Sequence, residues 1–259
     1  MLAYLAALKS AEKSEKDPSQ NQNELGQVVG EDMLDWAPAQ LPTDETMVGH
    51  FCRLERLDPE KHAEDLYEAF SVDAEGRNWT YLDEGPFPDF ESFEQYIKEL
   101  AAGNDPFSFA IIEQEGGKAL GVASYMNIVP ETGSIEVGHI HFSPLLQRKC
   151  GGTEAMFLMM QRVFDKWGYR RYEWRCNALN KVSRKAAVRL GFSYEGTLRQ
   201  ASVVKGKNLD TAWFSVLDSE WPVLRASFEK WLSPANFKEN GARIKTLSEL
   251  VAREEVRVF

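Results

Sequence analysis

Cysteine is scarce in this chain of 259 residues, which contains only three. Cys52, Cys150 and Cys176 lie far apart, with no C-x-x-C pair and no histidine-rich segment beside them. This spacing supports neither a disulfide framework nor a zinc site, so we expect no bound metal. A reducing, cytoplasmic location is the one that fits these cysteines best.

Long apolar runs are also missing. No segment approaches the roughly 18 consecutive apolar residues that a membrane-spanning helix needs. The N-terminal run MLAYLAAL has no leading positive charge and is soon followed by Glu12, Glu15 and Asp17, which argues against a signal or transit peptide. We therefore expect no association with a membrane.

Positive charge is in deficit, with 30 Lys and Arg against 40 Asp and Glu and a net charge of −10. Such a balance argues against general nucleic-acid binding. The deficit is uneven, because residues 147–189 hold eleven Lys and Arg against only three Asp and Glu. This cationic island predicts a site for a polyanionic ligand, although solvated helix faces would give the same pattern.

The spacing of apolar residues predicts one domain over residues 47–221. Residues 1–46 are interpreted as a polar N-terminal extension. Residues 222–259 are interpreted as a helical C-terminal extension that packs on the domain or serves as the arm of a homodimer. Strands are predicted at 48–57, 107–113, 119–129, 134–142 and 171–176, with a hairpin at 194–217. Helices are predicted at 59–70, 90–101, 151–167 and 182–190.

The segment LLQRKCGGTEAM, residues 145–156, is typical of a glycine-containing turn that opens a helix directly after a strand. The first turn of a helix presents unpaired backbone N–H groups at its positive end, where phosphate oxygens bind readily. A Walker-type loop fits less well, because no Lys followed by Ser or Thr closes the glycine segment. We therefore expect a phosphorylated cofactor at this turn.

Two segments in order, IEVGHIHFSPLLQRKCGGTEA and NALNKVSRKAAVRLGFSYEG, resemble motifs A and B of the GNAT superfamily of acetyl-CoA-dependent N-acetyltransferases. The branch of ribosomal-protein N-terminal acetyltransferases is the most similar. The resemblance covers roughly residues 48–221. It implies an α+β fold with a mixed, mostly antiparallel sheet flanked by helices, and acetyl-CoA as the acyl donor.

This chain departs from the family pattern at two places. The family's phosphate loop reads Q/R-x-x-G-x-G/A, and here Gln147 and Gly152 match while Cys150 replaces the first glycine. The loop can still work, since main-chain N–H groups hold the phosphates. We interpret Cys150 as a small residue in place of glycine, with a reactive thiol as the alternative. The tyrosine that often protonates the thiolate is replaced by Ala187.

The resemblance also implies which residues contact coenzyme A. Backbone N–H groups near Ile140 would stabilise the oxyanion, and the basic side chains would add charge to the phosphates. The expected cofactor contacts are Ile140, His141, Phe142, Gln147, Arg148, Lys149, Cys150, Gly151, Gly152, Thr153, Asn180, Ser183, Arg184 and Lys185.

Acetyl transfer to an amine requires a base, because an alkylamine with a pKa near 10 is protonated at neutral pH. Glu136 is the first candidate, since it lies eleven positions before Gln147, a spacing similar to that of the glutamate base in some GNAT enzymes. A surface or ion-paired structural glutamate is the alternative reading. His139 and His141 are further candidates that would share one strand face. Ser183 is the candidate proton donor to the thiolate, with helix capping as the alternative.

The acceptor is predicted to be the primary amine of a small molecule such as an amino acid or a polyamine. Its expected contacts are Trp79 and Tyr81, in an aromatic loop, together with Tyr125 and His139. Direct transfer in a ternary complex is favoured over an acyl-enzyme, because Cys150 belongs to the phosphate loop. A protein N-terminus as acceptor and a non-catalytic CoA-binding protein remain alternatives.

Overall fold

The structure, a computed structural model, describes residues 21–251. The predicted N-terminal apolar run lies outside the described residues. Residues up to Pro38 and residues from Ala39 onward form two separate compact units. In the first unit, Gln22 and Val28 form an isolated antiparallel bridge.

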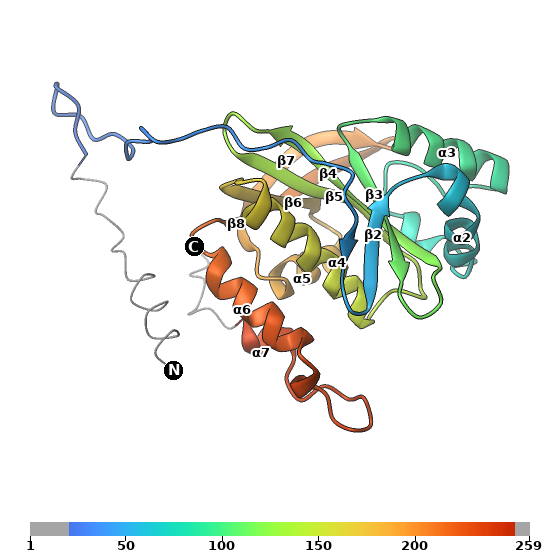
Figure 1. The fold of residues 1–259 in the computed structure, drawn as a ribbon. Helices are drawn as coiled ribbons and strands as arrows, with labels where there is room; N and C mark the ends of the chain where they lie inside the picture. Colours follow the sequence, from blue (N-terminus) through green and yellow to red (C-terminus); the bar gives the residue numbers. More distant parts are fainter. Residues whose placement is uncertain (1–20, 252–259) are drawn as a thin grey trace. The chain divides into compact units, whose positions relative to one another are not determined.

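An eight-stranded sheet organises the second unit, in the order β1-β2-β3-β4-β5-β6-β8-β7 (Figure 1). Every neighbouring pair is antiparallel except β5 and β6, which are parallel. The predicted mixed, mostly antiparallel α+β fold is therefore confirmed. The strands are β1 (Met47–Val48), β2 (Cys52–Arg56), β3 (Phe107–Glu113), β4 (Ala119–Val129), β5 (Ser134–Phe142), β6 (Arg171–Asn177), β7 (Ser193–Val204) and β8 (Lys207–Leu217).

Several helices begin at a capping side chain, among them α2 and α3. Asp58 accepts a hydrogen bond from the Glu60 N–H at the first of them, and Asp89 accepts one from the Ser92 N–H at another. The helices are α2 (Pro59–Ser71), η2 (Arg77–Trp79), α3 (Phe90–Ala102), α4 (Cys150–Gln161), η3 (Arg162–Lys166), α5 (Lys181–Arg189), α6 (Trp221–Leu232), η4 (Pro234–Asn236) and α7 (Leu247–Leu250).

Each face of the sheet packs against its own set of helices. On one face, α4, α5 and α6 bury apolar residues of the sheet in a large core that includes Ile135 and Val137 of β5. On the other face, α2 and α3 form a smaller core with β3 and β4, which includes Val122. The residues of β5 that alternate with Ile135 and Val137 therefore face away from α4.

Two predicted elements differ in the structure. The predicted strand 48–57 is correct for β2 but not as one unbroken strand, because residues 49–51 form a turn and β1 and β2 pair antiparallel. The predicted helix 151–167 is α-helical only to Gln161, and its last turn, η3, is a π-helix. The remaining elements of the domain lie within a few residues of their predicted bounds.

The predicted C-terminal extension packs on the domain. Phe228 of α6 stacks on Phe157 of α4 with ring centroids 5.2 Å apart. Trp221 also donates a hydrogen bond of 2.6 Å from its Nε1 to the Asp165 carboxylate. Of the two predicted roles, packing on the domain is the one observed, and the homodimer stays a prediction.

The carboxylate of Glu154 joins the first turns of α4 to the β1–β2 turn. Its oxygens accept hydrogen bonds from the N–H groups of His50, Phe51 and Cys52 at 2.8, 2.6 and 2.8 Å. A Cβ atom added at Gly49 would overlap this carboxylate, so the turn requires glycine there. Glu154 is only 3% exposed, and these three donors compensate for the burial of its charge.

We expect Glu154→Ala to lower the free energy of unfolding by about 3 kcal/mol, because three backbone N–H groups lose their acceptor. Urea denaturation followed by circular dichroism measures the loss. Glu99→Ala, on the exposed side of α3, is the matched control and should change stability by less than about 0.5 kcal/mol. Equal effects of the two substitutions would show that the Glu154 contacts contribute nothing.

Candidate active site

β5 and β6 pair for only part of their length. The last paired residues are Val137 and Trp174, and no residue of β5 after Val137 pairs with β6. A bulge lies at this point of β5, where His139 has a φ of 45° and the register with β4 shifts. The segment from Ile140 to Phe142 therefore keeps β4 on one edge, while its other edge leaves backbone groups available to a ligand.

The predicted phosphate loop lies at the N-terminus of α4, directly after β5. The N–H groups of the first turn of a helix have no intrahelical acceptor. Here Lys149 occupies the N-cap position and makes no side-chain capping bond to them. A Cβ atom added at Gly152 would lie 3.1 Å from the Phe142 ring, so a glycine suits the close approach of loop and strand. Gln147 donates hydrogen bonds to the Phe142 carbonyl oxygen at 2.9 Å and to Asn78 at 3.1 Å.

The N-terminus of α5 lies beside the other strand of the pair. Asn180 caps this helix by accepting a hydrogen bond from the Ser183 N–H at 3.0 Å, as in the capping interpretation. The Ser183 hydroxyl accepts a hydrogen bond of 3.0 Å from Nε1 of Trp174 on β6. The Arg184 side chain donates to the Ala178 carbonyl oxygen at 3.3 Å, while Lys185 is exposed.

Glu136 is buried on the face of β5 that points away from α4. Its carboxylate lies 3.0 Å from Nε of Arg175 and accepts a hydrogen bond of 2.7 Å from Asn127. Burial raises the pKa of Glu136 to about 7, although Arg175 and Asn127 oppose the shift. Glu136 is thus a buried, ion-paired carboxyl group with a proton affinity suited to acid–base chemistry near neutral pH.

Comparison with known proteins identifies the family. The sequence matches the model of the acetyltransferase (GNAT) domain over residues 52–193. The crystal structure of a GCN5-related N-acetyltransferase from Brucella melitensis is 45% identical, with a TM-score of 0.83, over 85% of this chain and 99% of that one. The chain belongs to the GNAT acetyltransferase family.

Other relatives agree with this assignment. The structure of a probable GNAT-family acetyltransferase from Chromobacterium violaceum is 38% identical, with a TM-score of 0.70, over 75% of this chain and 96% of that one. The N-acetyltransferase p20 of Bacillus licheniformis is 28% identical over 148 residues, 54% of this chain and 80% of that protein. The predicted N-acetyltransferase activity is therefore confirmed.

The predicted branch also has a counterpart among the solved structures. The ribosomal L7/L12 α-N-protein acetyltransferase RimL shares the fold, with a TM-score of 0.58 and 19% identity, over 70% of this chain and 98% of that one.

Among residues 21–251, no helix is long and apolar enough to cross a membrane.

The two candidate histidines of this acetyltransferase have different surroundings. The His141 ring stacks on Phe70, with centroids 3.8 Å apart, and burial lowers its pKa to about 3. Its ring is therefore part of the core that β5 shares with α2, a position that favours a packing role over the predicted role of a base. Burial also lowers the pKa of His139, and Asp83 of the aromatic loop opposes this shift. Nδ1 of His139 is buried without a hydrogen-bond partner.

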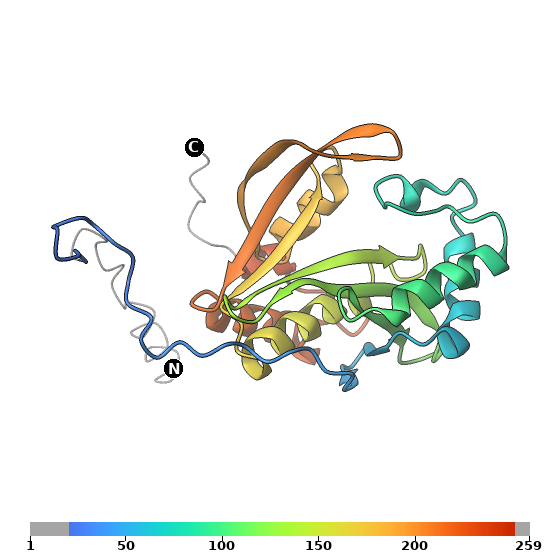
Figure 2. The ribbon, with the colours of Figure 1, turned by 90° about the horizontal axis from the view of Figure 1, so that it is seen from above.

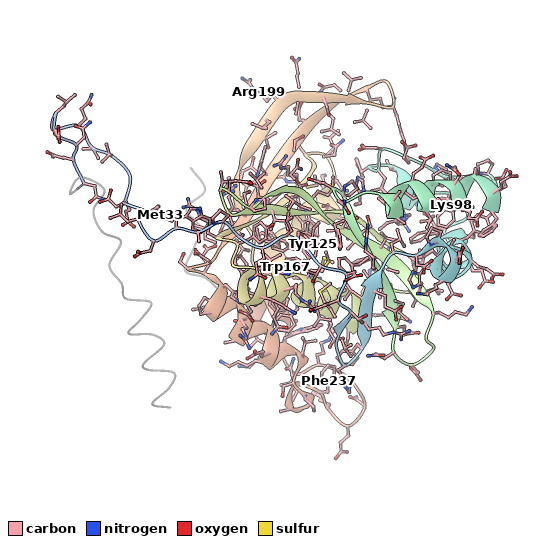
Figure 3. All side chains as sticks on the ribbon, turned by 45° about the horizontal axis from the view of Figure 1, so that its top comes forward. Met33, Lys98, Tyr125, Trp167, Arg199 and Phe237 are labelled. Atoms are coloured by element: carbon pink, nitrogen blue, oxygen red, sulfur yellow. The ribbon has the colours of Figure 1, made fainter. Side chains whose placement is uncertain are left out.

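The predicted acceptor contacts also differ in their surroundings, since some are buried in a core and one is exposed. The prediction for Tyr125 is wrong, because its side chain is fully buried on the α4 face, where its hydroxyl donates to the Met159 carbonyl oxygen at 2.9 Å. Figure 3 shows Tyr125 beside Trp167 in this interior. Trp79 is 5% exposed and packs against Phe70 and His141. Tyr81 is exposed, and its hydroxyl lies 3.4 Å from the Leu179 carbonyl oxygen.

The sequence interpretation missed several polar residues around Glu136. Arg175 lies two residues after Glu173 on β6, so both point to the same face as Glu136, and Arg175 also pairs with Glu173 at 2.7 Å. This alternation of charge along a buried strand was a usable signal. Asn127 gave no signal in the sequence, because its contact with Glu136 depends on the register of β4.

The raised pKa of Glu136 predicts how stability depends on pH. The folded state binds this proton more tightly than the unfolded chain, so the contribution of Glu136 to the stability of the wild type falls as the pH rises from about 4.5 through 7. The free energy of unfolding of Glu136→Gln should therefore increase relative to wild type by about 3 kcal/mol between pH 4.5 and 8.5. Urea denaturation across this range measures it. If the wild type instead became more stable relative to Glu136→Gln as the pH rises, the ion pair with Arg175 would outweigh the effect of burial on the pKa of Glu136.

Proposed function

We propose that this enzyme transfers an acetyl group from acetyl-CoA directly to the primary amine of a small molecule. The observation that carries the choice of a small acceptor is a bridge across the site. It connects the aromatic loop, residues 72–89, with the elements on the far side of β5.

The bridge is made chiefly by Lys205. Its ammonium donates hydrogen bonds to the carbonyl oxygens of Trp79, Glu84 and Gly85 at 3.2, 3.1 and 2.9 Å. Lys205 and Gly206 both have positive φ and form the two-residue turn between β7 and β8, as in a type I′ hairpin. In Figure 2 the tip of this hairpin reaches toward the loop that contains η2.

Two further contacts tie the aromatic loop to the edges of the site. Tyr81 contacts the Leu179 carbonyl oxygen in the β6–α5 connection, and Asn78 accepts a hydrogen bond from Gln147 of the phosphate loop. The loop therefore spans the region where β5 and β6 stop pairing. A long peptide would have to displace it, whereas a small amine would not.

The charges around the site favour a cationic acceptor. Asp83 of the aromatic loop lies close enough to His139 to influence its pKa, and both Asp83 and Glu84 act on Tyr96. Glu136 adds a carboxyl group three residues before His139 on β5. These groups would attract an ammonium ion and hold it before its proton is removed.

The residues of the α4 N-terminus fit the phosphates of coenzyme A. The uncapped first turn offers backbone N–H donors, Gly152 permits the close packing, and Lys149 adds positive charge. When bound, acetyl-CoA supplies the activated acetyl thioester. Thr153 is buried, with its hydroxyl facing Arg189, so it would contact the phosphates only indirectly.

In the proposed chemistry, Glu136 accepts the proton of the acceptor ammonium and leaves a neutral amine. The free edge of β5 from Ile140 to Phe142 supplies backbone N–H donors for the developing oxyanion. Ser183, held by Trp174, orients or protonates the departing sulfur. Cys150 lies in the phosphate loop with its Sγ against Arg243, which favours direct transfer over an acyl-cysteine.

The acceptor class is tested with acetyl-CoA and a panel of polyamines, amino acids and N-terminal peptides, with thiol release as the readout. We expect turnover of small amines and a value of kcat/KM for peptides at least about tenfold lower. Lys205→Met should narrow this difference, because it removes the bridge. Arg199→Gln, exposed on β7 (Figure 3), is the control. Preferred turnover of peptides would overturn the proposal, and binding of acetyl-CoA without any turnover would indicate a non-catalytic protein.

The role of Glu136 is tested by the pH dependence of Glu136→Gln. We expect kcat/KM near pH 7 to fall about 100-fold, with a smaller loss toward pH 10, where an alkylamine is already neutral. The wild-type profile should rise with an apparent pKa near 7. Glu99→Gln on α3 is the control. A parallel decrease at every pH would contradict the assignment of Glu136 as the base.

A further inference from the structure

Two arginines from different elements meet at the first turn of α4. Arg189, in the last turn of α5, donates a hydrogen bond of 3.1 Å to the hydroxyl of Thr153. Arg243, which follows α6, donates one of 3.1 Å to Sγ of Cys150. Cys150 and Thr153 are one helical turn apart on α4, so the two guanidinium groups flank the same end of this helix.

Neither guanidinium has a carboxylate partner within 4.0 Å in the part of the chain that the structure describes. Burial and the nearby charge of Arg243 lower the pKa of Arg189. Arg171 and Arg175 differ, because each pairs with two glutamates. Two like charges at the positive end of a helix repel each other and the helix dipole, and an anion bound between them would relieve this repulsion.

The chain holds Arg243 in place. Its guanidinium lies over the Trp231 ring, 4.1 Å from the centroid. Arg243 also pairs with Phe237, labelled in Figure 3, through an isolated antiparallel bridge. Asn236 fixes the start of this turn through hydrogen bonds to the carbonyl oxygens of Trp231 and Lys245. Because the fold already orders this side chain, little entropy is lost when it binds an anion.

A pocket of about 590 Å³ lies beside Arg243, whereas Arg189 is not among the residues that line it. Arg243 lines it together with Lys149, Cys150 and Gly151 of the α4 N-terminus, while Glu113 and Glu115 line the side formed by the β3–β4 turn. The basic residues of the lining thus lie on the side of α4, where Lys149 Nζ is 3.8 Å from the Glu113 carboxylate and Arg243 has no carboxylate partner in the described part of the chain. A phosphate placed there would lie beside the loop that holds the remaining phosphates.

We propose that Arg189 and Arg243 bind the 3′-phosphate of coenzyme A. This inference rests on the proposed use of acetyl-CoA as the acyl donor. A pyrophosphate can be held by main-chain N–H groups, whereas a phosphate monoester carries nearly two negative charges at neutral pH and is matched by two guanidinium groups. The segment after α6 therefore contributes directly to the cofactor site, at a distance in sequence from the two GNAT motifs.

The test compares the dissociation constants of coenzyme A and 3′-dephospho-coenzyme A by calorimetry. We expect the wild type to bind coenzyme A at least about 30-fold more tightly, as two charge-assisted contacts imply. Arg243→Gln and Arg189→Gln should each reduce this ratio by about fivefold, and the double variant should bring it close to one. Binding of the dephospho form should stay within about twofold of wild type. Arg199→Gln, an exposed arginine on β7, should leave the ratio unchanged.

The outcomes separate this inference from the proposed function. The assignment of the two arginines alone would be overturned if the wild type bound coenzyme A and 3′-dephospho-coenzyme A equally tightly. It would also be overturned if the variants lost the same affinity for both ligands. Failure of the wild type to bind either ligand would overturn the use of coenzyme A as well. Binding of inorganic phosphate as tightly as coenzyme A would assign the pair to free phosphate instead. Urea denaturation of each variant shows whether a reduced ratio of dissociation constants results from unfolding of the variant.

Discussion

The contact between Glu154 and the β1–β2 turn fixes the end of α4 on which the site depends. Three backbone donors hold a buried carboxylate one turn inside this helix, so the helix cannot slide along the sheet without leaving the charge and the donors unpaired. The phosphate loop immediately precedes the first turn of α4, so this contact also fixes the position of the loop relative to β5. A helix end that binds phosphates through its backbone needs such an anchor, because its N–H groups cannot adjust like side chains.

The partial pairing of β5 explains why binding and acid–base chemistry can occur at one strand. Up to Val137 the strand is paired on both edges, which buries Glu136 between β4 and β6. Beyond the bulge at His139, one edge is free to bind a ligand. The paired part of β5 thus buries Glu136, which raises its pKa to about 7, while the part beyond the bulge leaves backbone donors unpaired on one edge.

Local patterns in the sequence predicted most of the fold, because the strands β3 to β6 and helices α2, α3 and α5 have clear apolar periods and caps. The turn at Gly49–Phe51 was missed, since the charge that stabilises it comes from Glu154, about a hundred residues later. Glu136 was singled out through its position relative to a family motif, but its ion pair with Arg175 depends on the register of β5 and β6. Tyr125 was misassigned, because alternation along β4 does not say which face meets α4.

In the proposed arrangement, the segment after α6 adds an arginine to the cofactor end of the enzyme from outside the matched GNAT region. The match to the GNAT domain ends at residue 193, whereas Arg243 lies beyond α6 and reaches back to Cys150. Substitutions in this segment alter the charge beside the phosphate loop without changing β5, β6 or the aromatic loop. If this segment holds the 3′-phosphate as proposed, substitutions in it would change how tightly the acyl donor is held without touching the proposed acceptor site.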